Sequence, residues 1–351
     1  MRTVHGVVQH YAWGDPTFIP RLLHIEPDGR PFAEIWFGTH QGGPGSIAHG
    51  GPLETVSGRL PYLLKVLAAA EPLSLQTHPT RRQAEEGYAR EERDGPTVDA
   101  RTRIYRDPYP KPELLCALTP FDALCGFRPL EATMELLLHL GAQHLIDEIT
   151  EHGLSATVEG LYRGTIDLTP TLEACRGRDE PEAQLAHEMA LHWRADPSAV
   201  VTLLLNRVML EPGEAIFLGP GNLHAYVRGA GVEIMGASDN VVRGGMTSKH
   251  VDVDQLLSVV NIEPLAEPRL RAVQIDEGQW YYPTVDTPFR LWRWDVDGGL
   301  RHTASGRELL LCTEGDLKGF RPGEVIYLAP DEAVDLLGKG TVFRVEETGT
   351  G

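Results

Sequence analysis

The sequence predicts a mainly β protein of two related barrels, with an α-helical region inserted into the first of them. Glycine (37) and proline (26) are abundant among the 351 residues, which is typical of short strands joined by tight turns. The spacing of apolar residues is that of a helix in residues 128–198 and that of strands before and after this region. A short motif occurs at Pro212 and again at Pro322, which indicates two copies of one strand-and-turn unit.

Strands and turns dominate the chain before the change of period. We expect strands in residues 3–71, where TVHGVVQHYAW, AEIWFGTH and PYLLKVLAAAEPLSLQTHP follow one another. Residues 80–94 (TRRQAEEGYAREERD) favour a helix at the surface, because so many charged side chains need water. Strand character returns in residues 109–127. We assign residues 1–127 to the first part of a barrel.

Residues 128–198 read as a helical insertion. Apolar side chains recur there at helical spacing: Leu130, Met134, Leu137 and Leu138. A second helix is predicted for PEAQLAHEMALHWRAD, because Pro181 suits a first helical turn and Pro197 follows the end.

The repeated motif divides the rest of the chain. We expect residues 199–265 to complete the first barrel and residues 266–351 to form a second one. PGEAIFLGP leads on to His224, whereas PGEVIYLAP leads on to Val334 at the equivalent position. We therefore expect a polar ligand only in the first barrel and a structural role for the second.

Charge and hydropathy limit the partners and the location. With a formal charge of -18, the chain lacks the basic surface of a nucleic-acid binder. The same negative charge repels anions at long range, so an anionic substrate needs a local cluster of cations. No apolar run reaches the ~18 residues of a membrane-spanning helix, and the N-terminus has no signal-peptide pattern. The four cysteines show no CxxC pairing, which suits reduced thiols in a core. We expect a cytoplasmic monomer.

Three short segments carry candidate metal ligands and pocket residues. Side chains two apart on a strand point to the same face. Each segment therefore presents a ligand with polar neighbours beside it: Ser74, Gln76 and His78 in PLSLQTHP, Lys111 and Glu113 in YPKPEL, and His224 and Tyr226 in GNLHAYV. Two imidazoles, one carboxylate and one amide oxygen suit zinc or a similar divalent ion. Taken singly, His78 and His224 more often are ordinary hydrogen-bonded strand residues, whereas Glu113 among apolar neighbours is less ordinary, because an unpaired buried carboxylate is costly.

Several long segments together resemble the type I mannose-6-phosphate isomerases (phosphomannose isomerases). They occur in the family's order, from about residue 3 to residue 260: AWG, PYLLKVLAAAEPLSLQTHP, KPELLCALTPFDALCGFRP, EPGEAIFLGPGNLHAY and SDNVVRGGMTSKHVDV. The resemblance implies a cupin fold, which is a double-stranded β-helix or jelly roll. It also implies an aldose–ketose isomerase that interconverts D-mannose 6-phosphate and D-fructose 6-phosphate.

The resemblance also implies the site. The family's zinc ligands fall on Gln76, His78, Glu113 and His224, with one Zn²⁺ expected per chain. Arg243 matches the family's active-site arginine, and Lys249 matches a lysine near the phosphate. We expect the remaining substrate contacts to come from Ser74, Lys65, Tyr226 and Trp13, although core packing is an equal expectation for Trp13.

Isomerisation through a cis-enediol requires ring opening, a base that moves a proton between C1 and C2, and stabilised charge on O1 and O2. Arg243 and the metal would stabilise that charge. Lys111 is slightly preferred as the base, because a nearby cation would favour its neutral form. Glu233 is the competing base, and Asp239 is a candidate for ring opening.

The chain departs from the family at Pro110 and slightly in GVEIMGA, which retains Glu233, and other functions stay open. The family often has a histidine directly before its KPE motif, where this chain has Pro110. The protein could instead be an isomerase of another phosphosugar or an iron-dependent oxygenase. It could also bind sugars without turnover. Oxygen consumption and an assay with mannose 6-phosphate separate these cases.

Overall fold

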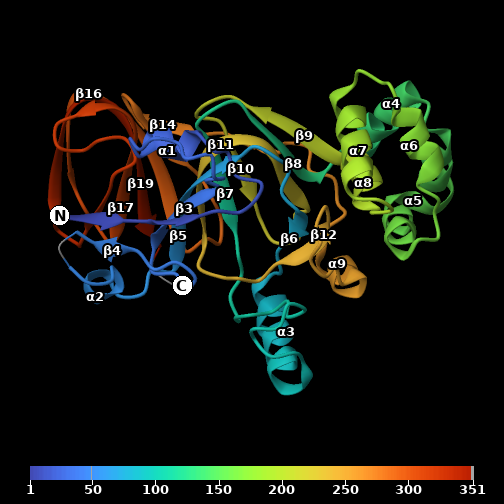
Figure 1. Cartoon of the computed structure of the whole chain (residues 1–351), viewed down its shortest axis with the longest axis horizontal. Helices are drawn as coiled ribbons and strands as arrows, with labels where there is room; N and C mark the ends of the chain where they lie inside the picture. Colours follow the sequence, from blue (N-terminus) through green and yellow to red (C-terminus); the bar gives the residue numbers. More distant parts are fainter. Residues whose placement is uncertain (49, 349–351) are drawn as a thin grey trace.

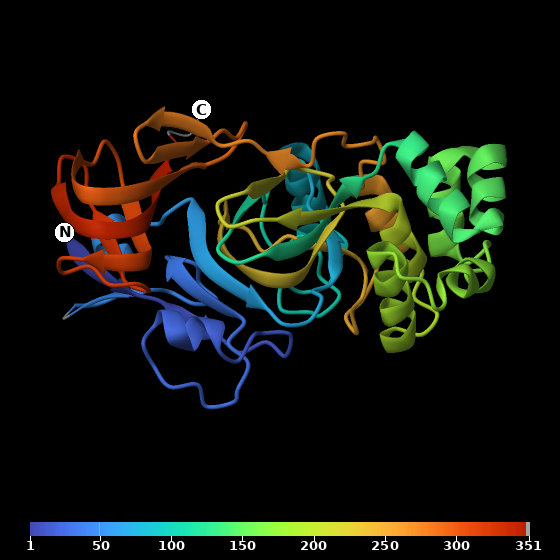
Figure 2. The ribbon, with the colours of Figure 1, turned by 90° about the horizontal axis from the view of Figure 1, so that it is seen from above.

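Antiparallel strands make up most of the regular structure of this chain. The computed structural model describes residues 1–48 and 50–348. Two sheets lie side by side, with eight strands in one and eleven in the other. In Figures 1 and 2 the eight-stranded sheet lies at one end of the molecule, the eleven-stranded sheet in the middle and a group of helices at the other end. The expected mainly β class is confirmed.

The eleven-stranded sheet contains every segment with a candidate ligand. Its strands are β2 (Val7–Gln9), β3 (Glu34–Gly38), β5 (Tyr62–Ala69), β6 (Leu75–Thr77), β7 (Glu113–Ala117), β8 (Phe121–Phe127), β9 (Leu205–Leu210), β10 (Ala215–Leu218), β11 (His224–Gly236), β12 (Val242–Gly245) and β13 (Arg269–Leu270).

Strand β11 joins the two layers of this sheet. Its first part pairs with β6 and β8, and its second part, from Gly229 onward, pairs with β5 and β7. Gly229 lies at the change of partners with a φ of 125°. A Cβ atom there would lie 2.7 Å from a side-chain atom of Phe121 and from the carbonyl oxygen of Pro120. Only glycine fits this corner, which brings residues from both layers to one site.

The eight-stranded sheet combines the C-terminal segment with the start of the chain. Its strands are β1 (Arg2–His5), β4 (Ser46–Ile47), β14 (Val273–Asp276), β15 (Gln279–Tyr282), β16 (Phe289–Thr303), β17 (Glu308–Leu317), β18 (Val325–Leu328) and β19 (Ala333–Glu347). Strand β1 pairs with β18 and with β4. We expected residues 1–127 to belong with the first barrel; within that range β1 pairs with the C-terminal strand β18, and β4 joins the same sheet through β1.

Most of the helical structure lies between β8 and β9. The helices there are α4 (Leu130–Leu140), α5 (Gln143–Arg163), α6 (Thr169–Cys175), α7 (Pro181–His192), α8 (Ser198–Val201) and the short 3-10 helix η1 (Thr202–Leu204). The helical period predicted α4 and α7. The prediction of the buried face of α4 was only partly right. Leu137 is buried as expected, together with Thr133 and Leu140, but Leu130 and Leu138 are exposed.

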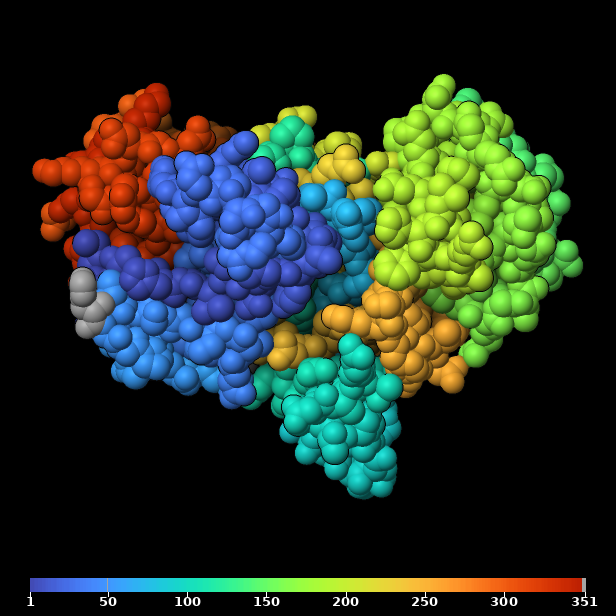
Figure 3. All heavy atoms as spheres, in the orientation of Figure 1, coloured from blue at the N-terminus to red at the C-terminus, as the bar shows by residue number. Residues whose placement is uncertain are grey.

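The remaining helices are α1 (Phe18–Leu22), α2 (Glu54–Ser57), α3 (Arg81–Asp94) and α9 (Val253–Val259). Helix α3 confirms the charged helix expected near residues 80–94, and it projects from the body of the molecule in Figure 3. The side chains of Thr80 and Gln83 form a capping box at its start, which satisfies otherwise free backbone N–H groups. No helix within residues 1–48 and 50–348 has the length and apolar character needed to cross a membrane.

The repeated motif forms the same local structure twice. Strands β10 and β18 each begin three residues after the proline of PGE, and Gly213 and Gly323 have φ values of 90° and 83° in the turns. A left-handed conformation of this kind favours glycine. Val334 is buried in an apolar cluster with Trp294 and Leu310, so no polar ligand stands there. All four cysteines are free and buried.

Candidate functional site

Four candidate ligands meet where β6, β7 and β11 lie together. Gln76 in β6 is the register partner of His224, the first residue of β11. His78 directly follows β6, and its ring centroid lies 5.2 Å from that of His224. Glu113 is the first residue of β7 and pairs with the far end of β11. Strand pairing thus assembles four side chains that are distant in sequence.

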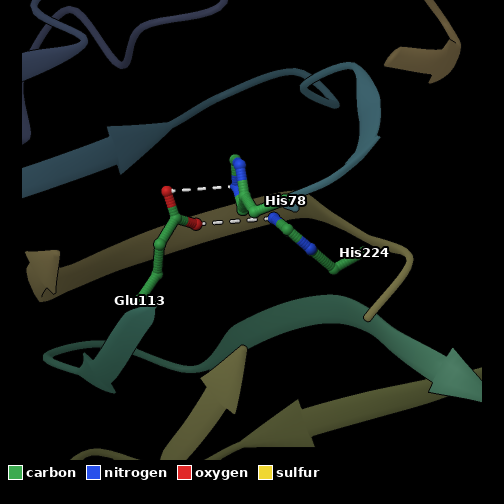
Figure 4. A group of neighbouring side chains, drawn as sticks. All are labelled: His78, Glu113 and His224. Atoms are coloured by element: carbon green, nitrogen blue, oxygen red, sulfur yellow. Dashed lines mark ion pairs between the residues drawn. The ribbon is translucent and has the colours of Figure 1, made fainter. Parts of the chain in front are cut away.

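The ligand atoms face one another closely. Each Glu113 oxygen faces one histidine: His78 Nε2 lies 3.4 Å from Oε1 and His224 Nε2 lies 3.4 Å from Oε2, as Figure 4 shows. The three ligand atoms all lie within 4.8 Å of one another. The amide nitrogen Nε2 of Gln76 lies 3.4 Å from His224 Nε2. A half-turn of this amide group would present its oxygen, the atom that binds a cation.

Burial and hydrogen bonding leave the ring nitrogens of this cluster free for a cation. His78, Glu113 and His224 are 0%, 2% and 1% exposed. His78 donates its Nδ1–H to the Asn240 carbonyl oxygen (2.8 Å), and His224 donates its own to the Asn222 carbonyl oxygen (2.9 Å). Each Nε2 atom therefore carries a lone pair directed at the centre.

The same cluster leaves buried polar atoms without hydrogen bonds. His78 Nε2 and Glu113 Oε2 have no hydrogen-bond partner among the described residues. Buried polar atoms left in this state are costly. A divalent cation at the centre would satisfy them, so the donor set fits zinc or a similar ion.

Charge in the cluster also suits a cation. Burial lowers the pKa of His78 to about 4, so the ring is neutral at neutral pH. Burial alone would raise the pKa of Glu113, but the charge of Lys111 and the contacts with both histidines hold it well below its usual range. Lys111 Nζ lies 3.1 Å from Glu113 Oε1. Lys111 therefore points to the ligand cluster, as its spacing from Glu113 predicts.

A second buried network lies behind the ligands. Lys65 Nζ lies 3.0 Å from Glu233 Oε2 and 3.4 Å from Glu34 Oε1. The Tyr226 hydroxyl donates to Glu233 Oε1 (2.8 Å), and the Trp36 indole N–H donates to Glu34 Oε2 (2.6 Å). Burial raises the pKa of Glu233. Burial also opposes the charge on Lys65, but the two carboxylates outweigh this and raise its pKa.

Two members of this network, Glu34 and Trp36, were not expected from the sequence. Glu34 and Trp36 alternate on β3 within AEIWFG, and the carboxylate in that apolar strand was an available signal. Tyr226 is 3% exposed and its hydroxyl is occupied by Glu233. Little of this ring is left to contact a sugar, so the contacts favour a positioning role for Tyr226.

The expected cations lie together with two that were not expected. Arg243 in β12 is the register partner of Gln76. Burial and the charge of Arg106 lower the pKa of Arg243. Partial burial lowers the pKa of Lys249, as do the charges of Arg243, Arg106 and Arg101. The arginine-rich segment RTRIYRDP was the available signal for this basic cluster, which we define as Arg101, Arg106, Arg243 and Lys249.

Asn240 links Arg106 of the basic cluster to the ligand His78 through hydrogen bonds. The backbone N–H of Arg106 donates to Asn240 Oδ1 (2.7 Å), and the Asn240 carbonyl accepts from the ring of His78. Arg103 turns inward between these cations and contacts Glu91 and Glu92. Its neighbours Arg101 and Arg106 remain exposed.

The other expected residues lie around this core. Asp239 is half-exposed and pairs with His40, whose Nε2 lies 3.3 Å from Asp239 Oδ1; no motif had pointed to His40. Ser74 is half-buried directly before β6. Trp13 is half-buried against the apolar cluster that contains Phe121 and Tyr226, which favours the packing role over a sugar contact.

Comparison with known proteins gives consistent matches. Residues 46–130 match the family model "Phosphomannose isomerase type I, catalytic domain". The chain is 33% identical to the mannose-6-phosphate isomerase of Salmonella typhimurium, over 98% of this chain and 99% of that one. It is 27% identical to the human mannose-6-phosphate isomerase, over 94% and 93% of the two chains.

Solved structures show the same similarity. A crystal structure of a phosphomannose isomerase variant from Salmonella typhimurium superimposes with a TM-score of 0.89 at 30% identity, covering 99% of both chains. A crystal structure of a mannose 6-phosphate isomerase described as the zinc-bound holo form superimposes with a TM-score of 0.88 at 29% identity, covering 99% of both chains.

Proposed function

Because the chain belongs to the type I mannose-6-phosphate isomerases, we propose that it interconverts D-mannose 6-phosphate and D-fructose 6-phosphate at the buried ligand cluster. The observation that carries this proposal is the convergence of His78, Glu113 and His224, where His78 Nε2 and Glu113 Oε2 find no hydrogen-bond partner within residues 1–48 and 50–348. Gln76 lies at the same point. The proposed reaction is an intramolecular oxidation and reduction, in which the carbonyl group moves between C1 and C2.

We propose zinc as the resident ion. Gln76, His78, Glu113 and His224 would hold it, and a zinc-bound relative has the same fold. Since the set contains a single carboxylate, a bound zinc ion would keep positive charge and supply Lewis-acid stabilisation of a developing oxyanion. The chain's own residues have the remaining tasks, which are to bind the phosphate, open the ring and move the proton.

We propose that Lys111 moves the proton between C1 and C2 of a cis-enediol. Lys111 lies beside the ligand cluster, with Nζ 3.1 Å from Glu113. Glu233 is less suited, because Tyr226 engages one of its oxygens and Lys65 the other. Both oxygens of this carboxylate are held by neighbouring side chains, which makes Glu233 less available to a carbon-bound proton.

The basic cluster supports the assignment of a phosphorylated substrate. Arg243 adjoins Gln76 across the β6–β12 pair, so we assign it to the negative charge that develops on O1 and O2. Lys249, with Arg106 and Arg101, would hold the phosphate group. This resolves the conflict between an acidic chain of charge -18 and an anionic substrate, because local cations outweigh distant acids.

We also propose the finer fold and the division into domains. Residues 1–127 with 199–265 would form a metal-binding cupin barrel, residues 128–198 a helical insertion, and residues 266–351 a second, degenerate barrel. The repeated turn-and-strand unit at Pro212 and Pro322 supports two related barrels. The pairing of β1 with β18 supports a modified boundary, in which the start of the chain completes the second barrel.

A coupled assay tests the proposed function directly. Purified protein is supplied with mannose 6-phosphate, and fructose 6-phosphate is measured before chelation, after chelation and after zinc is added back. We expect activity to disappear with the metal and to return with zinc. His224→Ala and Gln76→Ala should lose bound zinc and activity together. Full activity in metal-free protein would contradict the assignment.

A further inference from the structure

We propose that His40 is the positioning residue for Asp239, and that the carboxylate which it fixes carries the proton that opens and closes the sugar ring. The inference rests on the proposed function and adds a residue that no motif indicated. His40 lies in the segment after β3, whereas Asp239 lies in the segment between β11 and β12. Tertiary structure alone brings them together, with His40 Nε2 3.3 Å from Asp239 Oδ1.

The ring of His40 is held in one orientation and one tautomer. Its side chain is 9% exposed, and its ring packs edge-on against Trp36 with centroids 5.2 Å apart. The backbone N–H of Gly42 donates to His40 Nδ1 (3.1 Å). Because Nδ1 accepts this bond, the ring proton resides on Nε2, the atom that lies 3.3 Å from Asp239 Oδ1.

The backbone of Asp239 is held from the opposite side. Its N–H donates to Asp107 Oδ2 (2.9 Å), while the Ser238 hydroxyl donates to Asp107 Oδ1 (2.8 Å). The next residue, Asn240, accepts the ring N–H of His78 through its carbonyl oxygen. Asp239 is therefore fixed within one residue of a contact to a candidate metal ligand.

Exposure separates the roles of the two partners. The side chain of Asp239 is 52% exposed and that of His40 is 9% exposed. Only Asp239 can reach a sugar in solvent, and His40 acts through it. The charged and titratable groups that face Asp239 are His40, Lys111 and Arg106, with Tyr11 also near. The hydrogen bond from His40 is the first cause that lowers the pKa of Asp239, so the carboxylate is ionised and can accept a proton.

The proton balance of the step is closed. The O1–H proton passes to the Asp239 carboxylate as the C1=O1 bond forms and the C1–O5 bond breaks. The same proton then passes from Asp239 to O5, which becomes a hydroxyl group. Asp239 returns to its ionised state without any other reactant, and ring closure reverses each transfer.

The test compares His40→Ala with His40→Asn, in which an amide N–H can still donate. Exchange between the anomers of mannose 6-phosphate is measured by NMR, together with kcat, KM and zinc content. We expect His40→Ala to slow anomer exchange and kcat by about tenfold to a hundredfold, with KM and zinc unchanged. His40→Asn should recover part of this loss. The control His5→Ala, which removes an exposed imidazole on β1, should behave as wild type.

A double-mutant cycle separates positioning from structural damage. In an Asp239→Asn background, His40→Ala should cause no further loss, because both changes remove one function. A carboxyl NMR titration of Asp239 needs no activity, and its pKa should rise in His40→Ala. An inactive wild-type enzyme would overturn the proposed function but leave this titration valid. Unchanged titration, or additive losses in the cycle, would overturn the role of His40.

Discussion

Lys65 and Glu233 form a buried ion pair across the paired strands β5 and β11. Their Nζ and Oε2 atoms are 3.0 Å apart, and the side chains are 8% and 3% exposed. Glu34 approaches the same ammonium group from β3. One buried lysine therefore contacts two buried carboxylates and offsets part of their negative charge.

Removal of Lys65 should therefore destabilise the protein. Lys65→Met leaves Glu233 and Glu34 buried without their cation, and breaking such a pair costs about 3–5 kcal/mol. We expect a clearly lower melting temperature in a thermal scan. The control Lys339→Met breaks an exposed pair with Asp297 and should leave the melting temperature unchanged. Equal effects of the two changes would contradict the stabilising role of the buried network.

Loss of Arg243 should separate metal binding from turnover. Arg243→Ala removes the cation that we assign to the developing oxyanion, and such losses cost about a hundredfold to a thousandfold in kcat. Zinc content should stay at the wild-type level, because Arg243 is not among the ligands. Metal analysis and steady-state kinetics check both statements. Near-normal turnover would show that the assigned role is wrong.

Arg106 should affect binding of the phosphate group more than the chemistry. Arg106→Gln removes one cation of the basic cluster, so KM for mannose 6-phosphate and the inhibition constant for inorganic phosphate should each rise about fivefold to tenfold. The effect should weaken as salt is added. Arg82→Gln, an exposed arginine on α3, is the matched control. An unchanged inhibition constant in Arg106→Gln would exclude Arg106 from the phosphate site.

Hydrogen exchange at C2 distinguishes the two candidate bases. Lys111→Met should abolish exchange of the C2 proton with solvent, because the shuttle is gone. Glu233→Gln should still exchange, since the oxygens of Glu233 are already engaged by Tyr226 and Lys65. Proton NMR in heavy water follows both variants. The opposite pattern would transfer the role to Glu233.

The eight-stranded sheet should lose stability in acid through Glu308. Arg344 and His302 hydrogen-bond this buried carboxylate. Burial alone would raise the pKa of Glu308, but these contacts lower it overall. The carboxylate therefore stabilises the fold above about pH 4.3, the pKa of a glutamate in the unfolded chain. This stability is lost as the pH falls through the lower pKa of Glu308 in the folded protein.

Melting temperatures at several pH values test whether protonation of Glu308 destabilises the fold. The difference between wild type and Glu308→Gln should be largest above about pH 5 and should narrow below about pH 4.3. The exposed control Glu314→Gln should follow wild type at every pH. A constant gap for Glu308→Gln would show that Glu308 does not titrate with folding.

Much of the candidate site could be foreseen because its residues carry local signals. Q-x-H places two donors on one strand face, and a glutamate among apolar residues is costly unless it has a partner. These local features led to Gln76, His78 and Glu113, which the structure brings together with His224. The resemblance to the isomerase family, confirmed by the comparisons, added Arg243 and Lys249.

The sequence by itself determined the mainly β class, the charged helix α3, the repeated turn-and-strand unit and the family, because periodicity, turn residues and motifs act over short stretches of chain. Only the tertiary structure decided which distant segments meet. It paired β1 with β18, set His40 against Asp239 and placed Glu34 and Glu233 on either side of Lys65. Strand register and the corner at Gly229 govern these contacts, and neither property is encoded in the spacing of any single segment.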